Sequence, residues 1–533
     1  MKDAIPARGR GFISRFSIRL LILFLGLGPL LAAAGDNPFS PKNKQSRTLT
    51  ASAAAAPGRT LHVESSEADL TILAGNDAAV SVEAVVEVSE ADKDIVTYFL
   101  DNTKIALEPA SDGLTLRLVS PMDELNKRGG NPPRSGIFAR FFKGNKFVFK
   151  LSFFARLTVR VPARQALDVD NAYGHVQVNG LTGRLDIANS SGRVKVEGCG
   201  GELFLKNSYD LVEVPRFAGP VEVSNPSGKV VLRDVKGAAR VENSYNGVEF
   251  SGIEGNLTIR SQSGAVTGSG IRGDCEITTS YEKVDVRNIV GRLTVQAPSG
   301  TVIVDDVGKD AFIANSYNGV SATRIKGSLE IEANSSKVTV RTVTGNARIK
   351  TSYESVLAED IGGTLDLDAE SSAVRAAGVK GDASIRTSYA MVEALRIGGK
   401  LTVADNSGAV SADDIGGDVK VENSYNTVIL KRTSGAIDVK GNSSPIEVDA
   451  IRNIPKGASI RLITSYGDVR LTVPAGLQAA VSVKSEYGEI SSDLPIYQGA
   501  IESERYKADV AKGAFPIRIE TSSGNITIKS GGK

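Results

Sequence analysis

The sequence predicts an all-β protein whose largest part is a right-handed parallel β-solenoid (β-helix) with eighteen-residue coils. Three observations predict this fold. Glycine recurs at every eighteenth position between Gly183 and Gly435, an aliphatic residue follows each of these positions by four, and Val or Ile follows each by eleven. Lys309 alone interrupts the glycine series. A fixed period of this kind is typical of repeat architectures in which stacked units share one core.

The segment from Gly255 to Arg272 shows the pattern of a single coil. Leu257 and Ile259 alternate with polar residues, as in a half-buried strand. Val266 begins a second strand, and Ile271 marks a further inward position. The Ser, Asn and Gly clusters between them are turn residues. Because one coil cannot bury its own apolar side, neighbouring coils must stack, with parallel strands at a rise of about 4.8 Å per coil.

The hand of the solenoid follows from two arguments. Left-handed hexapeptide solenoids have coils of the same length, but they need an aliphatic residue at every sixth position. In this sequence Arg193 stands six positions after Ile187, and Gly247 stands six after Val241. Parallel crossover connections are right-handed by strong preference, so we expect a right-handed solenoid.

A second, longer period is superimposed on the first. Eight positions after each glycine position, Tyr and Ser alternate strictly along the repeats. The tyrosines are Tyr173, Tyr209, Tyr245, Tyr281, Tyr317, Tyr353, Tyr389 and Tyr425, and the serines are Ser191, Ser227, Ser263, Ser299, Ser335, Ser371, Ser407 and Ser443. The genetic unit is therefore a thirty-six-residue pair of coils. A single wider coil of the same thirty-six-residue length is an open alternative at this point.

Residues 1–34 have the pattern of a secretory signal peptide. A basic region precedes the apolar run Leu20–Leu31, and Ala32–Ala34 supplies an Ala-x-Ala cleavage site. The apolar run is short for a transmembrane helix, although an uncleaved anchor is an alternative. We therefore expect an exported bacterial protein that is periplasmic, displayed on the cell surface or secreted.

The remaining chain divides into four segments by composition and period. Residues 35–58 are polar and then Ala-rich, which predicts a linker. Residues 59–164 carry strand patterns and predict an N-terminal β segment that caps the solenoid. The regular coils occupy residues 165–452. Residues 453–533 lose the period, so we expect irregular coils and a C-terminal cap there.

The N-terminal β segment contains one strong shift in composition. No acidic residue occurs between Glu124 and Asp168, and Phe residues are interleaved with basic ones. Such a stretch could bind an anionic membrane surface. The alternative is a solvated basic face whose Phe side chains cover the end of the solenoid. The candidate contacts with an anionic surface are Arg134, Arg140, Lys143, Lys146 and Lys150.

The sequence shows no spacing typical of a metal, cofactor or nucleophile site, so we expect none of these. His62 and His175 lie far apart in the chain. Cys199 and Cys275 lie about four coils apart, too far for a disulfide, which predicts two free, buried thiols. A net charge of +2 gives no indication of a nucleic acid partner.

Paired carboxylates recur at one position of the repeat, in Asp305-Asp306, Glu359-Asp360 and Asp413-Asp414. Right-handed solenoid enzymes that cleave acidic polysaccharides use Asp and Glu clusters on such a face. Arginines occupy the same positions on intervening coils, however, which favours charge pairing along a solvated face. These arginines are Arg324, Arg341, Arg396 and Arg432.

The tyrosines of the longer period are the candidate ligand-facing residues. On every second coil they would stand about 9.6 Å apart, which is near the length of a disaccharide. Aromatic faces stack on sugars and carry a polar tip. The alternative is that each ring packs over the neighbouring Ser-Gly corner, large against small. The candidates are Tyr209, Tyr245, Tyr281, Tyr317, Tyr353, Tyr389 and Tyr425.

Several motifs resemble the bacterial putative-adhesin domain family of unknown function. They are the signal peptide, the N-terminal β segment that ends in Leu157–Pro162, and the serial Ser-Gly-x-Val and Ser-Tyr-x-x-Val corners. Ser465–Pro474 and Thr521–Ile526 have the same style. The resemblance covers nearly all of the mature chain. It implies a right-handed β-helix and brings no catalytic residues.

We therefore expect an exported, non-enzymatic β-solenoid that serves as a cell-envelope or surface interaction scaffold, similar to an adhesin. The alternative is a polysaccharide-binding module or a polysaccharide-acting β-helix enzyme. The expected partner is an envelope polysaccharide or another surface protein, and not a nucleic acid.

Overall fold

The computed structural model describes residues 43–55, 58–75, 78–90, 92–123, 142–143, 146–147, 151–494, 498–501, 505–510 and 515–531. The chain divides into two compact units, Met1–Val176 (unit 1) and Gln177–Lys533 (unit 2). The expected signal peptide lies outside the described residues. Among the described residues, no helix is both long and apolar enough to span a membrane.

Unit 1 is a β structure with one short helix. Its strands are β1 (Asn43–Ala54), β2 (Thr60–Gly75), β3 (Ala79–Glu90), β4 (Lys104–Ala110), β5 (Gly113–Val119), β6 (Phe142–Lys143), β7 (Lys146–Phe147), β8 (Ser152–Pro162) and β9 (Ala166–Tyr173). The strands β1, β3 and β8 pair antiparallel, whereas β2 runs parallel to β5, β8 and β9. Helix α1 (Lys93–Asp101) starts at the N-cap Asp92, whose carboxylate accepts a hydrogen bond from the Asp94 backbone amide.

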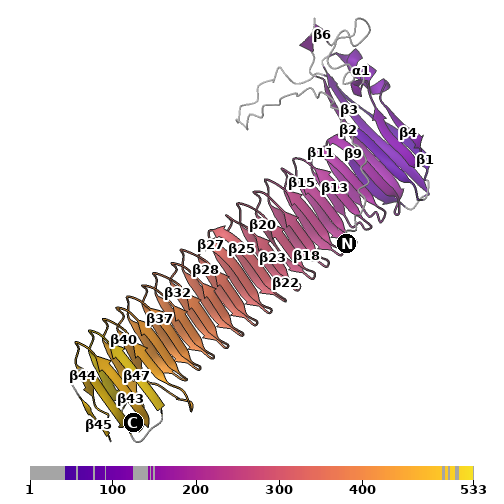
Figure 1. Cartoon of the computed structure of the whole chain (residues 1–533). Coiled ribbons are helices and arrows are strands. Elements are labelled where there is room, and N and C mark those ends of the chain that lie inside the picture. Colours follow the sequence, from indigo (N-terminus) through magenta and orange to yellow (C-terminus); the bar gives the residue numbers. More distant parts are fainter. Residues whose placement is uncertain are drawn as a thin grey trace, which may run out of the picture. The chain divides into compact units, whose positions relative to one another are not determined.

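Unit 2 is a parallel β-solenoid, and the solenoid as a whole has about 16 turns. Each coil contributes one strand to each of two sheets, and Figure 1 shows these strands stacked in chain order through the regular coils. The first sheet contains β12 (Val194–Glu197), β14 (Val212–Phe217), β16 (Val230–Val235), β18 (Val248–Ile253), β20 (Val266–Ile271), β22 (Val284–Ile289), β24 (Val302–Val307), β26 (Val320–Ile325), β28 (Val338–Val343), β30 (Val356–Ile361), β32 (Val374–Val379), β34 (Val392–Ile397), β36 (Val410–Ile415), β38 (Val428–Thr433), β40 (Ile446–Asp449) and β42 (Val469–Val473).

The second sheet holds the strands that precede the tyrosine and serine corners. It contains β11 (Leu185–Ser191), β13 (Leu203–Asn207), β15 (Val221–Asn225), β17 (Ala239–Asn243), β19 (Leu257–Arg260), β21 (Cys275–Thr278), β23 (Leu293–Gln296), β25 (Ala311–Tyr317), β27 (Leu329–Ser335), β29 (Ala347–Lys350), β31 (Leu365–Asp368), β33 (Ala383–Arg386), β35 (Leu401–Ala404), β37 (Val419–Asn423), β39 (Ile437–Gly441) and β41 (Ile460–Ile463). The strand β10 (Val176–Asn179) lies at the boundary of the two units.

The strand register establishes the length of the physical coil. Leu185 pairs with Leu203 in the second sheet, and Val212 pairs with Val230 in the first. In both cases the partner stands eighteen positions later in the sequence. The longer period of the tyrosines is therefore two stacked coils, and the alternative of one wide coil is wrong.

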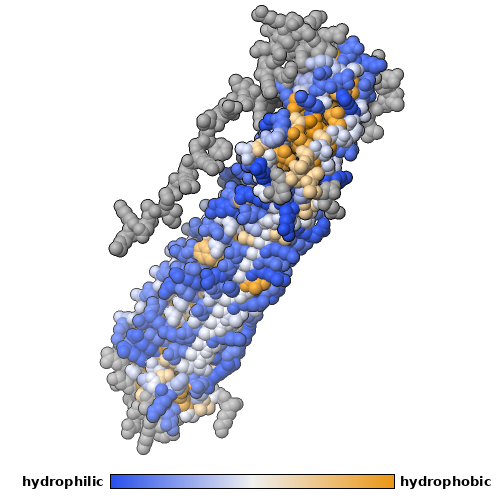
Figure 2. All heavy atoms as spheres, turned by 90° about the vertical axis from the view of Figure 1, so that its right-hand side faces the viewer, coloured by the Kyte–Doolittle hydropathy of each residue, from blue (hydrophilic) through white to orange (hydrophobic). Residues whose placement is uncertain are grey.

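The aliphatic positions of the repeat form the core. In the coil that begins at Gly255, Leu257 and Ile259 point inward from β19, and Val266 and Ile271 point inward from β20. The polar residues between them face solvent. In Figure 2, hydrophilic residues cover most of the visible face of unit 2. Cys199 and Cys275 are free and buried, as predicted, and burial raises the pKa of Cys275 to about 12.

A residue with left-handed backbone conformation near the end of most first-sheet strands explains the third inward side chain of the coil. Simple alternation from Val338 would turn Thr342 inward and Val343 outward. Instead Thr342 adopts a φ of 59°, the ladder skips it, and Val343 is buried. The same kink recurs at the equivalent position of most coils, with a glycine at Gly180, Gly198, Gly252, Gly270 and Gly378 and a residue with a side chain in the others.

The repeat glycines allow close approach of neighbouring coils at the opposite corner. A Cβ added to Gly219, which has a φ of 155°, would overlap the Gly201 carbonyl oxygen. A Cβ added to Gly291 would overlap the Gly273 carbonyl oxygen in the same way. The recurrence of glycine once in each coil therefore follows from the backbone contact between successive coils.

The C-terminal coils do not stack in chain order. The strands β43 (Ala479–Ser485), β44 (Ile490–Ser492), β45 (Gln498–Ile501), β46 (Arg505–Val510), β47 (Phe515–Thr521) and β48 (Ile526–Ser530) complete the chain. The last coil, β47 and β48, pairs with β41 and β42 on one side. It pairs with β43 and β44 on the other side. The end of the chain is thus inserted between two coils that precede it in sequence.

Candidate functional site

The tyrosine corner is built from a three-residue motif at the end of a second-sheet strand. In each tyrosine coil from Tyr209 to Tyr425, a buried Asn or Thr is followed by Ser and then Tyr, as in Asn315-Ser316-Tyr317. Asn315 is 4% exposed, whereas Tyr317 is 58% exposed. The motif therefore anchors the corner from inside and presents an aromatic ring outside.

Buried Asn side chains tie several tyrosine coils to the coil before them. The Asn315 Nδ2 donates to the carbonyl oxygens of Ala297 and Gly300, both at 2.7 Å. The Asn243 Nδ2 donates in the same way to Asn225 and Gly228, both at 2.8 Å. These amides satisfy backbone acceptors at a corner where the sheet ladder has ended. The sequence predicts only turn residues here and does not reveal this role, although a polar residue recurs six positions after the glycine position.

At this corner, the backbone of each serine coil lies close to the backbone of the tyrosine coil before it. Gly228 follows Ser227, and a Cβ added to it would overlap the Asp210 carbonyl oxygen of the preceding tyrosine coil. A Cβ added to Gly264 would overlap the Asn246 carbonyl oxygen. Backbone contact between coils therefore accounts for the Ser-Gly half of the alternation.

The tyrosines form an exposed row along one edge of unit 2. Tyr317 pairs with Ser335 in the register of β25 and β27, so the next tyrosine stands two coils away. The exposed fraction of the side chains from Tyr209 to Tyr425 lies between 57% and 70%. Packing over the Ser-Gly corner would cover the rings, but most of each ring's surface is accessible. This exposure indicates that packing of the rings over the Ser-Gly corner is not the only reason for the tyrosine row.

The alternation continues through the rearranged C-terminal coils. The backbone amide of Tyr466 donates to Asn442, as that of Tyr317 donates to Pro298. On the inserted coil, the backbone amide of Ser523 donates to the Ser465 carbonyl oxygen. On the coil beyond it, the backbone amide of Tyr487 donates to the Ser522 carbonyl oxygen. The order in space is therefore Tyr, Ser, Tyr, although the order in sequence is different. Tyr466 and Tyr487 are 66% and 84% exposed, so they extend the row.

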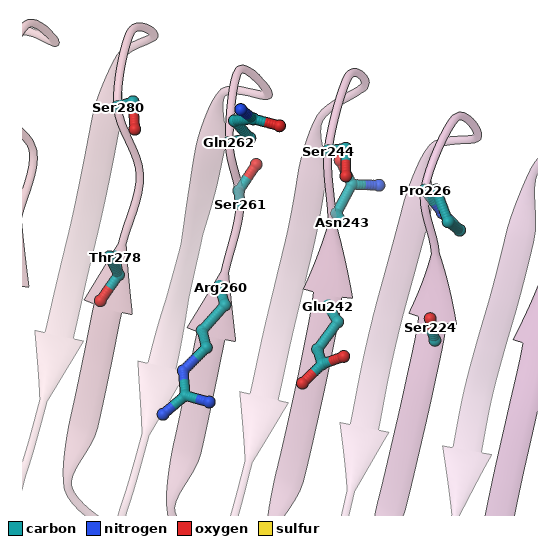
Figure 3. Close-up of a pocket in the computed structure, with 10 residues that line it drawn as sticks. All are labelled: Ser224, Pro226, Glu242, Asn243, Ser244, Arg260, Ser261, Gln262, Thr278 and Ser280. Atoms are coloured by element: carbon teal, nitrogen blue, oxygen red, sulfur yellow. The ribbon is translucent and has the colours of Figure 1, made fainter.

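A polar groove runs beside this row on the outer face of the second sheet. It consists of two hollows of about 400 and 600 Å³ that share Thr278 and Ser280. Figure 3 shows the first hollow, with Glu242 and Arg260 on neighbouring strands and Ser244, Gln262 and Ser280 nearer the corner. The groove could not be predicted from the sequence, because its walls combine side chains from several different coils.

A family model for the Toastrack DUF4097 domain matches residues 59–529, which is most of the chain. The chain belongs to the Toastrack DUF4097 family. This match confirms the resemblance to an adhesin-like β-solenoid family of unknown function. It includes unit 1 from residue 59 and nearly all of unit 2, so the inserted C-terminal coil lies within the matched range.

One solved structure aligns with this Toastrack chain, a "putative cell adhesion protein" from Clostridium sporogenes ATCC 15579. The alignment covers 91% of this chain and 100% of that one, with 8% identical residues and a TM-score of 0.13. Values this low carry no inference about fold or function. No curated protein matches the chain significantly.

Five of the six paired carboxylates of the Toastrack solenoid form ion pairs. Asp305 contacts Arg324, and Lys326 lies 3.2 Å from Asp306. Two more pairs join neighbouring coils, Arg341 with Glu359 at 3.0 Å and Arg432 with Asp413. Arg452 pairs with Asp414 two coils earlier. These contacts are the charge pairing that the alternating acidic and basic residues predicted.

In unit 1, His62 forms a polar cluster that sequence analysis did not find. Its Nδ1 lies 2.8 Å from the Asp168 carboxylate and its Nε2 lies 3.0 Å from Asp112. Burial lowers the pKa of His62, but the bonds to Asp168 and Asp112 outweigh burial and raise it. Both ring nitrogens are occupied by carboxylates, so the cluster is an ion-paired contact. Among the described residues, no group of three or more His, Cys, Asp or Glu side chains is placed so that it could hold a metal ion.

The basic and aromatic stretch is largely outside the described residues. Arg134, Arg140 and Lys150 lie there, so their expected contact with an anionic surface stays a prediction. The strands β6 and β7, which contain Lys143 and Lys146, pair antiparallel, and only their backbone is described.

Proposed function

We propose that the protein is an exported, non-enzymatic interaction scaffold of the cell envelope or cell surface, similar to an adhesin. The observation that carries this proposal is the repeated edge of unit 2. The same exposed tyrosine recurs on every second coil of a regular solenoid, beside a continuous polar groove. Solenoids use such extended surfaces to bind partners, because each coil adds one more copy of the same contact.

The charge arrangement supports a scaffold over a hydrolase or lyase. The acidic positions that resemble a catalytic face accept contacts from Arg or Lys on neighbouring coils. A carboxylate held this way has a cation of the same face as its partner, as in structural charge pairing. The signal-peptide pattern in residues 1–34 supports export.

Two measurements test the proposal together. Labelling of intact cells with a membrane-impermeant reagent, followed by purification, should recover the labelled protein with an envelope component. Incubation of the purified protein with acidic and neutral polysaccharides should release no oligosaccharide. Release of oligosaccharide would end the non-enzymatic interpretation, and labelling only after lysis would end the surface interpretation.

A further inference from the structure

The groove has the length and continuity of a site for an extended polymer. Its lining begins at Ser224 and ends at Ser352, which stand seven coils apart. At the spacing of parallel strands, this corresponds to about 34 Å along the solenoid axis. A small ligand would need one closed pocket, whereas these hollows are open and adjoin each other through shared residues.

The tyrosine row follows the groove with a fixed step. The serines Ser244, Ser280, Ser316 and Ser352 line it, and each directly precedes a tyrosine of the row. Two coils separate successive tyrosines, a step of about 9.6 Å. A ligand that meets every tyrosine must therefore repeat at this interval, as a linear polysaccharide does with each pair of sugars.

The chemistry of the lining indicates a neutral, hydroxyl-rich ligand. The charged residues of the groove alternate in sign, with Glu242 and Glu332 opposed by Arg260 and Lys350. Carboxylates only accept hydrogen bonds, and ammonium and guanidinium groups only donate them. Glu242 also accepts a hydrogen bond from Arg240 at 2.8 Å, which leaves its other lone pairs for a ligand. A sugar hydroxyl both donates and accepts, so one kind of ligand group can bond all four charged side chains and the accessible polar side chains around them.

We propose that the groove and the tyrosine row bind one chain of a neutral, linear polysaccharide along the solenoid axis, with one disaccharide for each pair of coils. The proposal rests on the proposed function and names the class of partner. The tyrosine rings stack on alternate sugars, and the groove residues bond the hydroxyl groups.

Two other polymers make different demands on the same site. An acidic polysaccharide would need a basic groove, but the charges here cancel. A proline-rich peptide in a polyproline II helix completes one turn in about 9.3 Å, so its step is similar. Such a peptide has few donors because proline has no backbone N–H, and the groove carboxylates would lose their partners.

The test measures the affinity of the purified exported protein for linear oligosaccharides of two to eight sugars, by titration calorimetry. The probes are neutral oligomers derived from cellulose, chitin, mannan and xylan, with polygalacturonate oligomers and a polyproline peptide for comparison. We expect a neutral series whose affinity rises in steps of two sugars. Binding that rises with single sugars, tighter binding of the acidic series, binding of the peptide alone, or no binding at all would overturn the proposal.

Variants locate the binding site. Replacing Tyr281, Tyr317 and Tyr353 together by Ala should weaken binding by at least about tenfold, because three stacking contacts are lost. The corresponding Phe variant should retain most of the affinity. Val290→Ala, which truncates an exposed apolar residue at the opposite, glycine corner, should leave binding unchanged. Equal affinity of the wild-type and triple Ala proteins would remove the tyrosine row from the site.

The outcomes also separate this inference from the proposed function. A surface-labelled protein that copurifies with a protein partner and binds no glycan would keep the scaffold and refute the glycan. A protein that binds neutral glycans through the tyrosines and also cleaves them would keep the site and refute the non-enzymatic scaffold.

Discussion

Replacing Asn315 by Ala should loosen the solenoid at one tyrosine corner. The Asn315 side chain is 4% exposed, and its Nδ2 donates to two backbone carbonyls of the preceding coil, each at 2.7 Å. Each bond contributes about 0.5–1.5 kcal/mol net, and its loss leaves a buried acceptor without its donor. The Ser336 hydroxyl also donates to Asn315 and would lose that acceptor. The expected cost is therefore about 2–3 kcal/mol in local stability.

Asn315→Thr is the matched variant, because Thr351 occupies the same position two coils later. The Thr351 hydroxyl lies 3.3 Å from the Ser336 carbonyl oxygen, so one donor of the corner is kept. The loss of local stability in Asn315→Thr should be about half of the loss in Asn315→Ala. Hydrogen exchange of peptides from residues 293 to 343 measures the local opening free energy in both variants. Exchange equal to wild type in the Ala variant would refute a structural role for this buried row of amides.

Three further predictions concern stability and are read from thermal melts. Val320→Asp should lower the free energy of unfolding by at least about 3 kcal/mol, because it places an unpaired charge at a site that is 2% exposed. Thr323→Asp on the outer face should change it by less than about 0.5 kcal/mol. Equal losses in the two variants would contradict the inward assignment of Val320. Thr342→Gly should stabilise by about 1 kcal/mol, because a β-branched residue there has a φ of 59°, and a lower melting temperature would count against backbone strain. Burial raises the pKa of Asp405, so ionisation penalises the folded state. Asp405→Asn should therefore raise the melting temperature at neutral pH. The gain should shrink as the pH falls through the raised folded-state pKa and be absent below the ordinary aspartate pKa. A gain independent of pH would show that charge is not the cause.

The regular coils could be predicted because their signals are local and repeated. Two kinds of residue recur at a fixed spacing: inward aliphatic residues such as Ile259, and glycines in close contact with the next coil, such as Gly291. Stacking the coils in register is the arrangement that buries the aliphatic residues. The kinks were not predictable from residue type. Thr342 and Gly252 adopt the same left-handed conformation, so only the spacing to the next buried residue marks the position.

The C-terminal insertion and the groove depend on contacts between distant residues. Ile517 pairs with Ile460 and also with Val481, a choice that no local pattern specifies. The segment from Ile517 therefore looked like a final coil. The thirty-six-residue period predicts the tyrosine row. The exposed fraction of the rings depends on how the neighbouring serine coil packs at the corner, which the period does not specify. The groove lies between such coils and has no signature of its own.

The central claim is that the tyrosine row of unit 2 is a binding surface and not part of the core. The most direct test is the thermal unfolding of the variant in which Tyr281, Tyr317 and Tyr353 are all replaced by Ala. Because these side chains are 58–67% exposed, the account predicts a melting temperature close to that of the wild type, with binding of the neutral glycan series lost. A large drop in melting temperature with unchanged binding would contradict it.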